Sequence, residues 1–320
     1  MKIINGVRIA ISNKSLWFKT LLAKTIVVIA FIVSLYFMAN IIIEPILKSA
    51  ELKSVIDAVR KIVSDFILFN DSNSEANAVL IKDTTTALIT YIQSMLANII
   101  WVGVGIVVFL QVVKFIFSMF DYVIGVNVNE HMSSMLHAGF FSTLFENFKM
   151  ASKYALFRTL LMFVYDLVVT GLMSLLFFSF MKLLGIYSLS LLVLVLFMAI
   201  ALRLTVTGLV LPVMICENKG PIEAFKVSLK YMRLQDSFNR FLSYLISAFV
   251  VYVVVIVSSI VTFNVAFVLA VPLCGIIFKS LRFVDYYTLT CKKYYMTFDD
   301  IVIPKELRQN DEQLLNKIDI

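Results

Sequence analysis

Charged side chains are scarce in this chain. Only 15% of its 320 residues are Asp, Glu, Lys or Arg, whereas 61% belong to the hydrophobic set. Soluble domains are nearer a quarter charged and half apolar. A soluble fold has no interior that could hide apolar runs of this length, so the natural solvent is a lipid bilayer. This composition excludes an ordinary cytosolic enzyme, a secreted disulfide scaffold, a disordered or collagen-like chain and a nucleic-acid-binding domain.

Residues and motifs that carry chemistry are also few. The three cysteines form no CxxC pair, and the two histidines, His131 and His137, are six residues apart and therefore on different faces of a helix. We expect both histidines at the surface and no bound metal. The sequence contains no nucleophile–base pair, no phosphate-binding loop and no paired carboxylates for acid–base work. It thus predicts a protein that is not an enzyme and that needs no cofactor.

Six apolar stretches are long enough to cross a bilayer as helices, which takes about 20 residues at about 1.5 Å each. They are Thr25–Ile43, Met95–Phe117, Thr159–Met181, Ser188–Val210, Phe241–Phe263 and Val265–Phe283. The first is too long for a signal-peptide core and lacks a cleavage site, so it is expected to remain as a membrane anchor. Around the spans lie residues 1–24, 44–94, 118–158, 211–240 and 284–320. The expected fold is all-α, with six transmembrane helices in three hairpins.

The distribution of lysine and arginine orients these spans. Residues 1–24 carry five basic residues and no acid, and residues 211–240 carry five basic residues against three acids. Residues 44–94 carry five basic residues against seven acids. Because basic loops stay in the cytoplasm, both termini are predicted to be cytoplasmic and residues 44–94 to lie outside.

The outer segment has a helical pattern of its own. Apolar residues recur at helical spacing between Leu52 and Phe66, and the stretch Asn70–Asn77 is polar and turn-like. The pattern predicts that the first span extends outward to about Phe69 and that a second helix returns from Ala78. The apolar stripe of this extracytoplasmic helical hairpin needs a partner, which is either the return helix itself, or another copy or another protein.

A nine-residue pattern occurs twice on the predicted cytoplasmic side. Residues 146–154 (ENFKMASKY) and 223–231 (EAFKVSLKY) have Glu, Phe, two Lys and Tyr at identical places, each copy before a two-span hairpin. Residues 13–24 precede the first hairpin in the same way, without the glutamate. Either the chain has three repeated units of an amphipathic helix and two spans, or lysine-rich helices on a membrane share these letters by chance. The residues predicted to dock a partner or lipid are Glu146, Phe148, Lys149, Lys153, Glu223, Phe225, Lys226 and Lys230.

The second copy lies within a longer recognisable segment. Gly220, Glu223, Ala224 and Ser228 match a Gly-x-x-Glu-Ala-apolar-x-x-Ser element between spans. Over about residues 209–291 the chain resembles a bacterial family of multipass proteins, the membrane domain found beside some glycerophosphodiester phosphodiesterases and in stand-alone proteins of unknown function. No phosphodiesterase domain is present in this chain, so that activity is not implied. The resemblance implies a six-span helical bundle in a bacterial plasma membrane without an assigned reaction.

Two ionisable residues, Asp166 and Arg203, fall at bilayer depth, where charges are costly. In an antiparallel hairpin, two residues at the same level are equally far along the chain from the centre of the turn. Asp166 and Arg203 are equally far from a turn centred between Leu184 and Gly185. We therefore expect an intramembrane ion pair, about 12 Å from the cytoplasmic end at about 1.5 Å per residue. The pair either fixes the register of the hairpin or forms a site where Arg203 binds an anion or Asp166 relays protons.

Three functions fit these features. The one we favour is a membrane component of a transport or export assembly, whose amphipathic helices dock a cytoplasmic partner such as an ATPase. The alternative is a membrane scaffold or envelope-homeostasis protein that acts alone or as a homo-oligomer, with the same helices lying on anionic lipid. The third is an intramembrane enzyme that uses Asp166, for which the sequence offers no facing polar group beyond Arg203 and Tyr165.

Overall fold

The computed structural model describes residues 2–67, 74–136, 139–184, 188–232, 237–262, 265–297 and 300–303, without the side chains of residues 65–67, 74–77, 181–184, 188–190 and 265–272. The chain divides into two compact units. The smaller unit comprises Ile26–Val113, and the larger unit comprises Met1–Thr25 and Lys114–Ile320. Two long helices, α2 (Lys14–Lys48) and α5 (Leu96–Ser134), contribute to both units.

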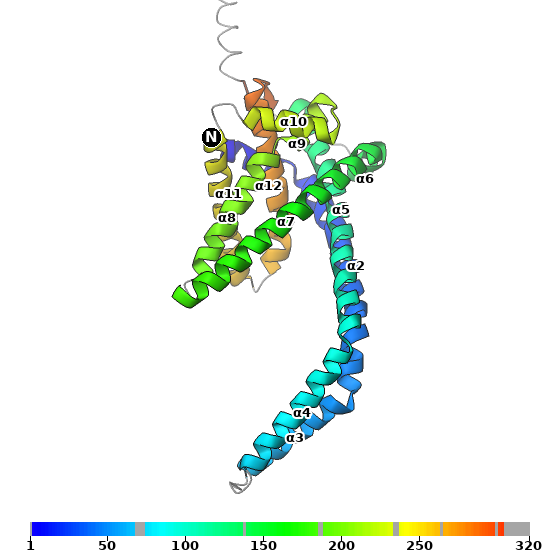
Figure 1. Ribbon diagram of the computed structural model, residues 1–320. Helices are drawn as coiled ribbons and strands as arrows, with labels where there is room; N and C mark the ends of the chain where they lie inside the picture. Colours follow the sequence, from blue (N-terminus) through cyan, green and yellow to red (C-terminus); the bar gives the residue numbers. More distant parts are fainter. Residues whose placement is uncertain are drawn as a thin grey trace, which may run out of the picture. The chain divides into compact units, whose positions relative to one another are not determined.

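The smaller unit contains the predicted outer segment. Here α2 is followed by α3 (Ala50–Ile67), α4 (Ser74–Ser94) and α5, and α3 packs beside α4 (Figure 1). Ser49 separates α2 from α3, and its hydroxyl caps α3 by accepting a hydrogen bond from the Leu52 N–H at 3.1 Å. The single helix expected to reach Phe69 is therefore two helices. The predicted turn lies partly outside the described residues, and its second half, from Ser74 on, is already helical.

The return helix α4 covers only part of the apolar stripe on α3. Ala58 is buried, whereas Ile56, Val59 and Val63 remain exposed. These three residues follow one another at intervals of three and four, so they form one continuous apolar face. The hairpin thus supplies its own neighbour and still leaves an apolar face uncovered.

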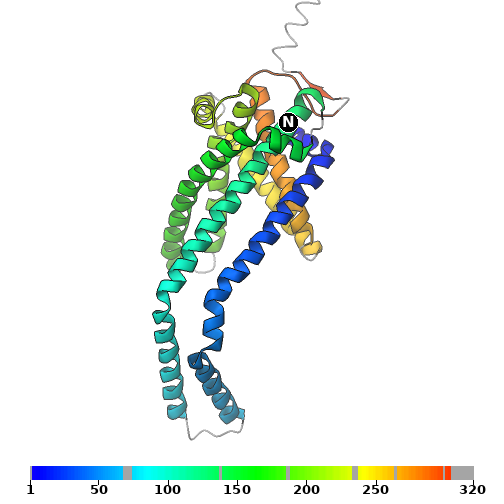
Figure 2. The same ribbon diagram turned by 90° about the vertical axis from the view of Figure 1, so that its right-hand side faces the viewer.

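The larger unit contains the remaining helices and a short sheet. The helices are α1 (Lys2–Ser12), α6 (Phe140–Glu146), α7 (Phe148–Leu184), α8 (Ser188–Thr207), α9 (Val210–Glu217), α10 (Pro221–Met232), α11 (Ser237–Val261) and α12 (Val265–Leu289). Helices α7 and α8 run side by side (Figure 2). Strands β1 (Tyr294–Tyr295) and β2 (Ile301–Val302) pair antiparallel. The expectation of a helical fold is confirmed for the described residues, with this small sheet as an addition.

Helix α1 lies against α12, and a glycine permits the close approach. A Cβ atom added at Gly6 would lie 3.2 Å from the Leu281 Cα, which is tighter than an ordinary contact. The Asn5 side-chain amide donates a hydrogen bond to the Tyr294 hydroxyl at 2.9 Å. Burial raises the pKa of Tyr294, so its hydroxyl stays protonated at neutral pH. The N-terminal segment is thereby built into the core of the larger unit.

The core of the larger unit gathers around the last turns of α5, where they meet α1, α9 and α12. His131 lies there, 1% exposed, with its Nε2 atom 2.8 Å from the Ser12 hydroxyl oxygen. The prediction of a surface position is wrong for His131, because α5 continues as a helix to Ser134 and carries the ring into the core. His137 lies outside the described residues.

Among the described residues, five helical stretches are long and apolar enough to cross a membrane. They are Lys14–Lys48, Leu96–Ser134, Phe148–Phe180, Leu191–Glu217 and Ser237–Val261. Many of their large apolar side chains are exposed in the folded chain, and so much free apolar surface requires lipid around it. The protein is therefore a membrane protein that contacts the bilayer. The sixth predicted span, Val265–Phe283, begins with residues whose side chains are not described, so it stays a prediction, as does the orientation.

Candidate functional site

Asp166, on α7, lies between basic side chains from two other helices. The Lys114 Nζ atom of α5 is 2.7 Å from Asp166 Oδ2, and the Arg203 Nη1 atom of α8 is 3.8 Å from Asp166 Oδ1. The Arg203 guanidinium also lies 5.9 Å from the centre of the Tyr165 ring, and the Tyr165 hydroxyl donates to the Ala199 carbonyl at 2.5 Å. The structure thus places the two predicted residues within ion-pair distance and adds Lys114 as the closer partner of Asp166. Two positive charges therefore face one negative charge at this position.

Replacing Asp166 with alanine is expected to lower the free energy of unfolding by about 1–3 kcal/mol, because Lys114 and Arg203 would then face each other without a counter-charge. The measurement is the melting temperature in detergent. A second replacement, Lys114→Met, should recover part of the loss. Glu44→Gln is the control, because Glu44 forms an exposed pair with Lys48 on one helix, and such a pair is worth about 0.5 kcal/mol or less. An Asp166→Ala variant as stable as the unmodified protein would contradict the prediction.

A second acidic residue of the larger unit, Asp121 on α5, holds three basic side chains. The Lys279 Nζ atom of α12 is 2.7 Å from Asp121 Oδ1, and the Lys24 Nζ atom of α2 is 3.7 Å from the same oxygen. Arg158 of α7 donates a hydrogen bond to Oδ2. Asp121 itself is buried. Four helices therefore meet at one carboxylate, whose charge is the counter-charge for all three cations.

The second copy of the repeated pattern lies in α10, which packs against the rest of the larger unit through small residues. Ala224 and Ser228 face inward, and the Ser228 hydroxyl donates to the Val206 carbonyl at 3.1 Å. Phe225 is half-buried, with its ring 5.7 Å from that of Phe157. The three charged docking candidates, Glu223, Lys226 and Lys230, are exposed. Phe225 is thus occupied by packing within the chain, and α10 presents a charged face.

The first copy is divided between two helices. Glu146 is the last residue of α6, and Phe148 is the first residue of α7, which continues into a span. All four docking candidates of this copy, Glu146, Phe148, Lys149 and Lys153, are exposed. The amphipathic helix expected at residues 146–154 is therefore not a separate helix, unlike α10. The two copies share letters but differ in structure, because the first is divided at Asn147 whereas the second lies within the single helix α10.

Exposed phenylalanines extend this region. Phe141, Phe145 and Phe148 are 50%, 75% and 56% exposed, whereas Phe140 and Thr143, on another face of α6, are buried in the core. We call Phe141, Phe145, Phe148 and the adjoining Glu146, Lys149 and Lys153 the α6–α7 surface. Helix α6 is thus apolar on two faces, of which one packs into the core of the larger unit. The other face needs a partner or lipid to cover it.

The comparisons with known proteins give a family and no function. Residues 18–291 match a family described as a family of unknown function, DUF7544. The chain belongs to the DUF7544 family. It matches no curated protein and no solved structure. The match covers both acidic centres, Asp121 and Asp166, together with the α6–α7 surface and α10. The function of this DUF7544 protein therefore has to be argued from its own residues.

Several members of the two charge clusters were missed in the sequence of this DUF7544 protein. The predicted second span, Met95–Phe117, contains Lys114 and ends before Asp121, and neither residue is among the predicted site residues. The signal was nevertheless present, because Asp121 interrupts a mostly apolar run from Phe115 to Val128. A charge within an apolar helix is expected to have a partner. Applied beyond the predicted end of the second span, this expectation points to Asp121.

The described part of the DUF7544 chain has few side chains that could bind a metal ion. No group of three His, Cys, Asp or Glu side chains among the described residues is arranged to hold one. Cys216, Cys274 and Cys291 are free, and the Cys216 thiol donates to the Asn129 side-chain oxygen at 3.1 Å. Charge clusters and an exposed aromatic surface are thus the features from which a function can be argued.

Proposed function

We propose that this protein is a non-catalytic membrane component of a transport or export assembly in a bacterial plasma membrane. In this proposal both termini are cytoplasmic, and the α6–α7 surface docks a cytoplasmic partner such as an ATPase. The observation that carries the proposal is the exposure of Phe141, Phe145 and Phe148 beside charged residues. Aromatic side chains at the centre with polar groups around them at the rim are typical of a protein interface.

The arrangement of α10 supports the same proposal. Ala224 and Ser228 pack its inward face against the larger unit, so the helix that carries the exposed Glu223, Lys226 and Lys230 is held in place. A fixed charged helix suits recognition of a partner, because charges across an interface set orientation and association rate. The small residues also give a physical reason for the Gly-x-x-Glu-Ala-apolar-x-x-Ser element. They let α10 pack against the end of α8.

A scaffold that acts alone, or as a homo-oligomer, is the second candidate. Lys149 and Lys153 lie close to the exposed phenylalanines in sequence, and α6–α7 joins a span directly. Apolar side chains with nearby lysines are also what a helix lying in the headgroup region of anionic lipid presents. In this case the α6–α7 surface is covered by lipid, and no second protein is needed.

The test is a pair of alanine replacements at the α6–α7 surface. Each protein is purified in mild detergent from native membranes. In a separate sample, a photo-crosslinking amino acid replaces Phe145. A stoichiometric cytoplasmic protein should crosslink at this position and co-purify, and Phe145→Ala with Phe148→Ala should reduce its recovery about tenfold or more, as for interface anchors.

Phe238→Ala is the matched control, because Phe238 is as exposed as Phe145 and lies at the start of a different helix. It should leave recovery of the partner unchanged. A chain that purifies alone, or only with itself, while position 145 crosslinks to lipid, would refute the docking proposal and favour the scaffold.

A further inference from the structure

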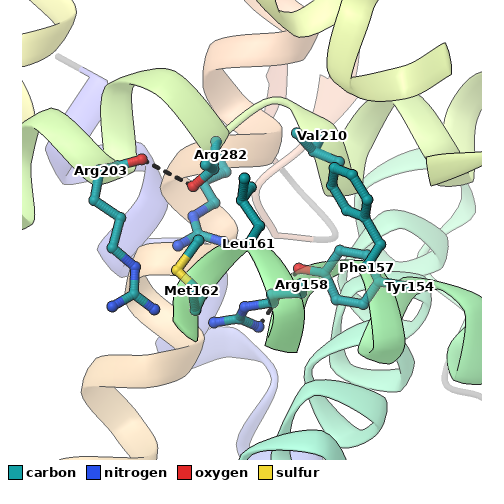
Figure 3. A pocket seen from close by; sticks show the side chains of 9 residues that line it. Tyr154, Phe157, Arg158, Leu161, Met162, Arg203, Val210 and Arg282 are labelled. Atoms are coloured by element: carbon teal, nitrogen blue, oxygen red, sulfur yellow. Dashed lines mark hydrogen bonds between the residues drawn. The ribbon is translucent and has the colours of Figure 1, made fainter. Parts of the chain in front are cut away.

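Three arginines from three helices surround a small hollow in the larger unit. Arg158 comes from α7, Arg203 from α8 and Arg282 from α12, with Tyr154 and Thr207 also at its wall. Figure 3 shows the three arginine side chains reaching the hollow from different sides. Its volume is about 20 Å³, which is the scale of a single water-sized group. None of its lining residues, all within the described part of the chain, carries a carboxylate.

The nearby acids neutralise these arginines only in part. Asp121 is bound by Arg158 but is shared with Lys24 and Lys279. Asp166 lies 3.8 Å from Arg203 but is closer to Lys114. The hollow therefore faces an excess of positive charge on the sides of α7 and α8.

Arg282 is the least compensated of the three. It is only 8% exposed, its Nε atom is buried without a hydrogen-bond partner, and it forms no ion pair with any described residue. Asp285, one turn further along α12, is paired with Lys2 at 2.9 Å. A buried guanidinium without an anion is costly, so an anion from outside the chain would complete this site.

The donors around the hollow suit one kind of anion. A guanidinium has a planar fork of N–H donors that matches the oxygens of a phosphate group. Tyr154 accepts a hydrogen bond from Arg158 at 3.4 Å, so its hydroxyl proton remains free to be donated to an anion. A hollow of this size admits about one oxygen of a phosphate group, with the rest of the group at its mouth, and excludes a bulky molecule.

We infer that this hollow binds a phosphate group. Arg158 and Arg282 stand next to the predicted ends of two spans and are therefore expected near the lipid headgroups, whereas Arg203 reaches the hollow from within the predicted fourth span. The phosphate of an anionic phospholipid can therefore reach the site, and so can a soluble phosphate from the cytoplasm. The inference does not depend on the proposed docking partner, since the hollow and the α6–α7 surface share no residue.

The experiment compares two sources of phosphate on the full chain. Native mass spectrometry in neutral detergent measures retention of dioleoyl phosphatidic acid against dioleoyl phosphatidylcholine. In parallel, the melting temperature is measured in sodium phosphate and in sodium chloride of equal ionic strength. A lipid ligand predicts preferential retention of phosphatidic acid. If the ligand is a soluble phosphate, the melting temperature should be higher in sodium phosphate than in sodium chloride. Added phosphate should also displace the retained lipid.

Two variants locate the binding. Arg282→Gln and Arg203→Gln should each weaken binding of the phosphate probe about tenfold, because each removes a charged donor. Arg203→Gln leaves Asp166 paired with Lys114, so it decides the matter if Arg282→Gln does not fold. Arg60→Gln, which removes the same charge from an exposed position in the smaller unit, is the control and should bind as the unmodified protein does. Equal retention of both lipids with no effect of phosphate, or folded variants that bind normally, would overturn the inference.

Discussion

Replacing Asp121 with asparagine is expected to destabilise the larger unit more than any other single charge removal. Asparagine keeps the size of the side chain, so the change isolates the charge. Lys24, Arg158 and Lys279 would then lie together in a buried site without their counter-charge. Removing one partner from a buried ionic group typically costs about 3–5 kcal/mol. This is a large part of the stability of an ordinary domain, so the variant should lose most of its folded material at 37 °C.

The measurement is the melting temperature in detergent, together with the yield of folded protein by size-exclusion chromatography. Asp57→Asn is the control, since Asp57 forms an exposed pair with Arg60 at 3.9 Å and should change the stability by less than about 1 kcal/mol. Adding Lys279→Met to Asp121→Asn should restore part of the loss, because one of the unbalanced charges is removed. If the Asp121→Asn variant melts at the same temperature as the unmodified protein, some other group must neutralise the three cations.

Replacing Gly208 with alanine is the second change with a large expected effect. Gly208 lies between the end of α8 and the start of α9. A Cβ atom at this position would lie 2.3 Å from the Leu204 carbonyl oxygen and 3.1 Å from the buried Tyr244 hydroxyl. The carbonyl belongs to the backbone and has little room to yield, so the junction itself has to move. We expect a loss of about 1–3 kcal/mol in the free energy of unfolding.

Gly171→Ala provides the matched control for this prediction. Gly171 lies within α7, and among the described residues no atom beyond its own stretch of helix lies within 4 Å of an added Cβ, so alanine meets no clash there. Because alanine favours the helix by up to about 1 kcal/mol, this variant should be as stable as the unmodified protein or slightly more stable. Melting temperatures of the two variants, measured side by side, give the comparison. Equal melting temperatures would mean that the α8–α9 junction adapts without cost.

The clustering of Asp121 with its cations also explains where the larger unit is most firmly packed. The same turns of α5 that carry Asp121 contribute Tyr122, Val123 and Ile124 to the core. The apolar middles of the long helices, in contrast, expose many large side chains to the surroundings. In a bilayer such a surface costs nothing, because lipid tails are as apolar as leucine. Stability is therefore expected to depend mainly on the charged and aromatic end of the unit.

Much of the membrane character of this protein was predictable from the sequence alone. Runs of about 20 apolar residues are a property of the chain in one dimension, and a helix converts them directly into spans. The same regularity made it possible to set Asp166 level with Arg203 from residue numbers, and the structure has the two side chains 3.8 Å apart. The helical character of the outer segment also followed from its apolar spacing.

Only the tertiary structure decided which residues meet across helices. Lys114 approaches Asp166, and Lys24, Arg158 and Lys279 converge on Asp121, from helices far apart in the chain. The matching letters of the repeated pattern likewise did not predict that Phe225 would pack on Phe157 while Phe148 stays exposed. The physical reason is that helical periodicity determines which face a residue occupies, whereas its partner depends on how the helices cross. That crossing is determined by side-chain packing over the whole unit, which spacing along one helix does not contain.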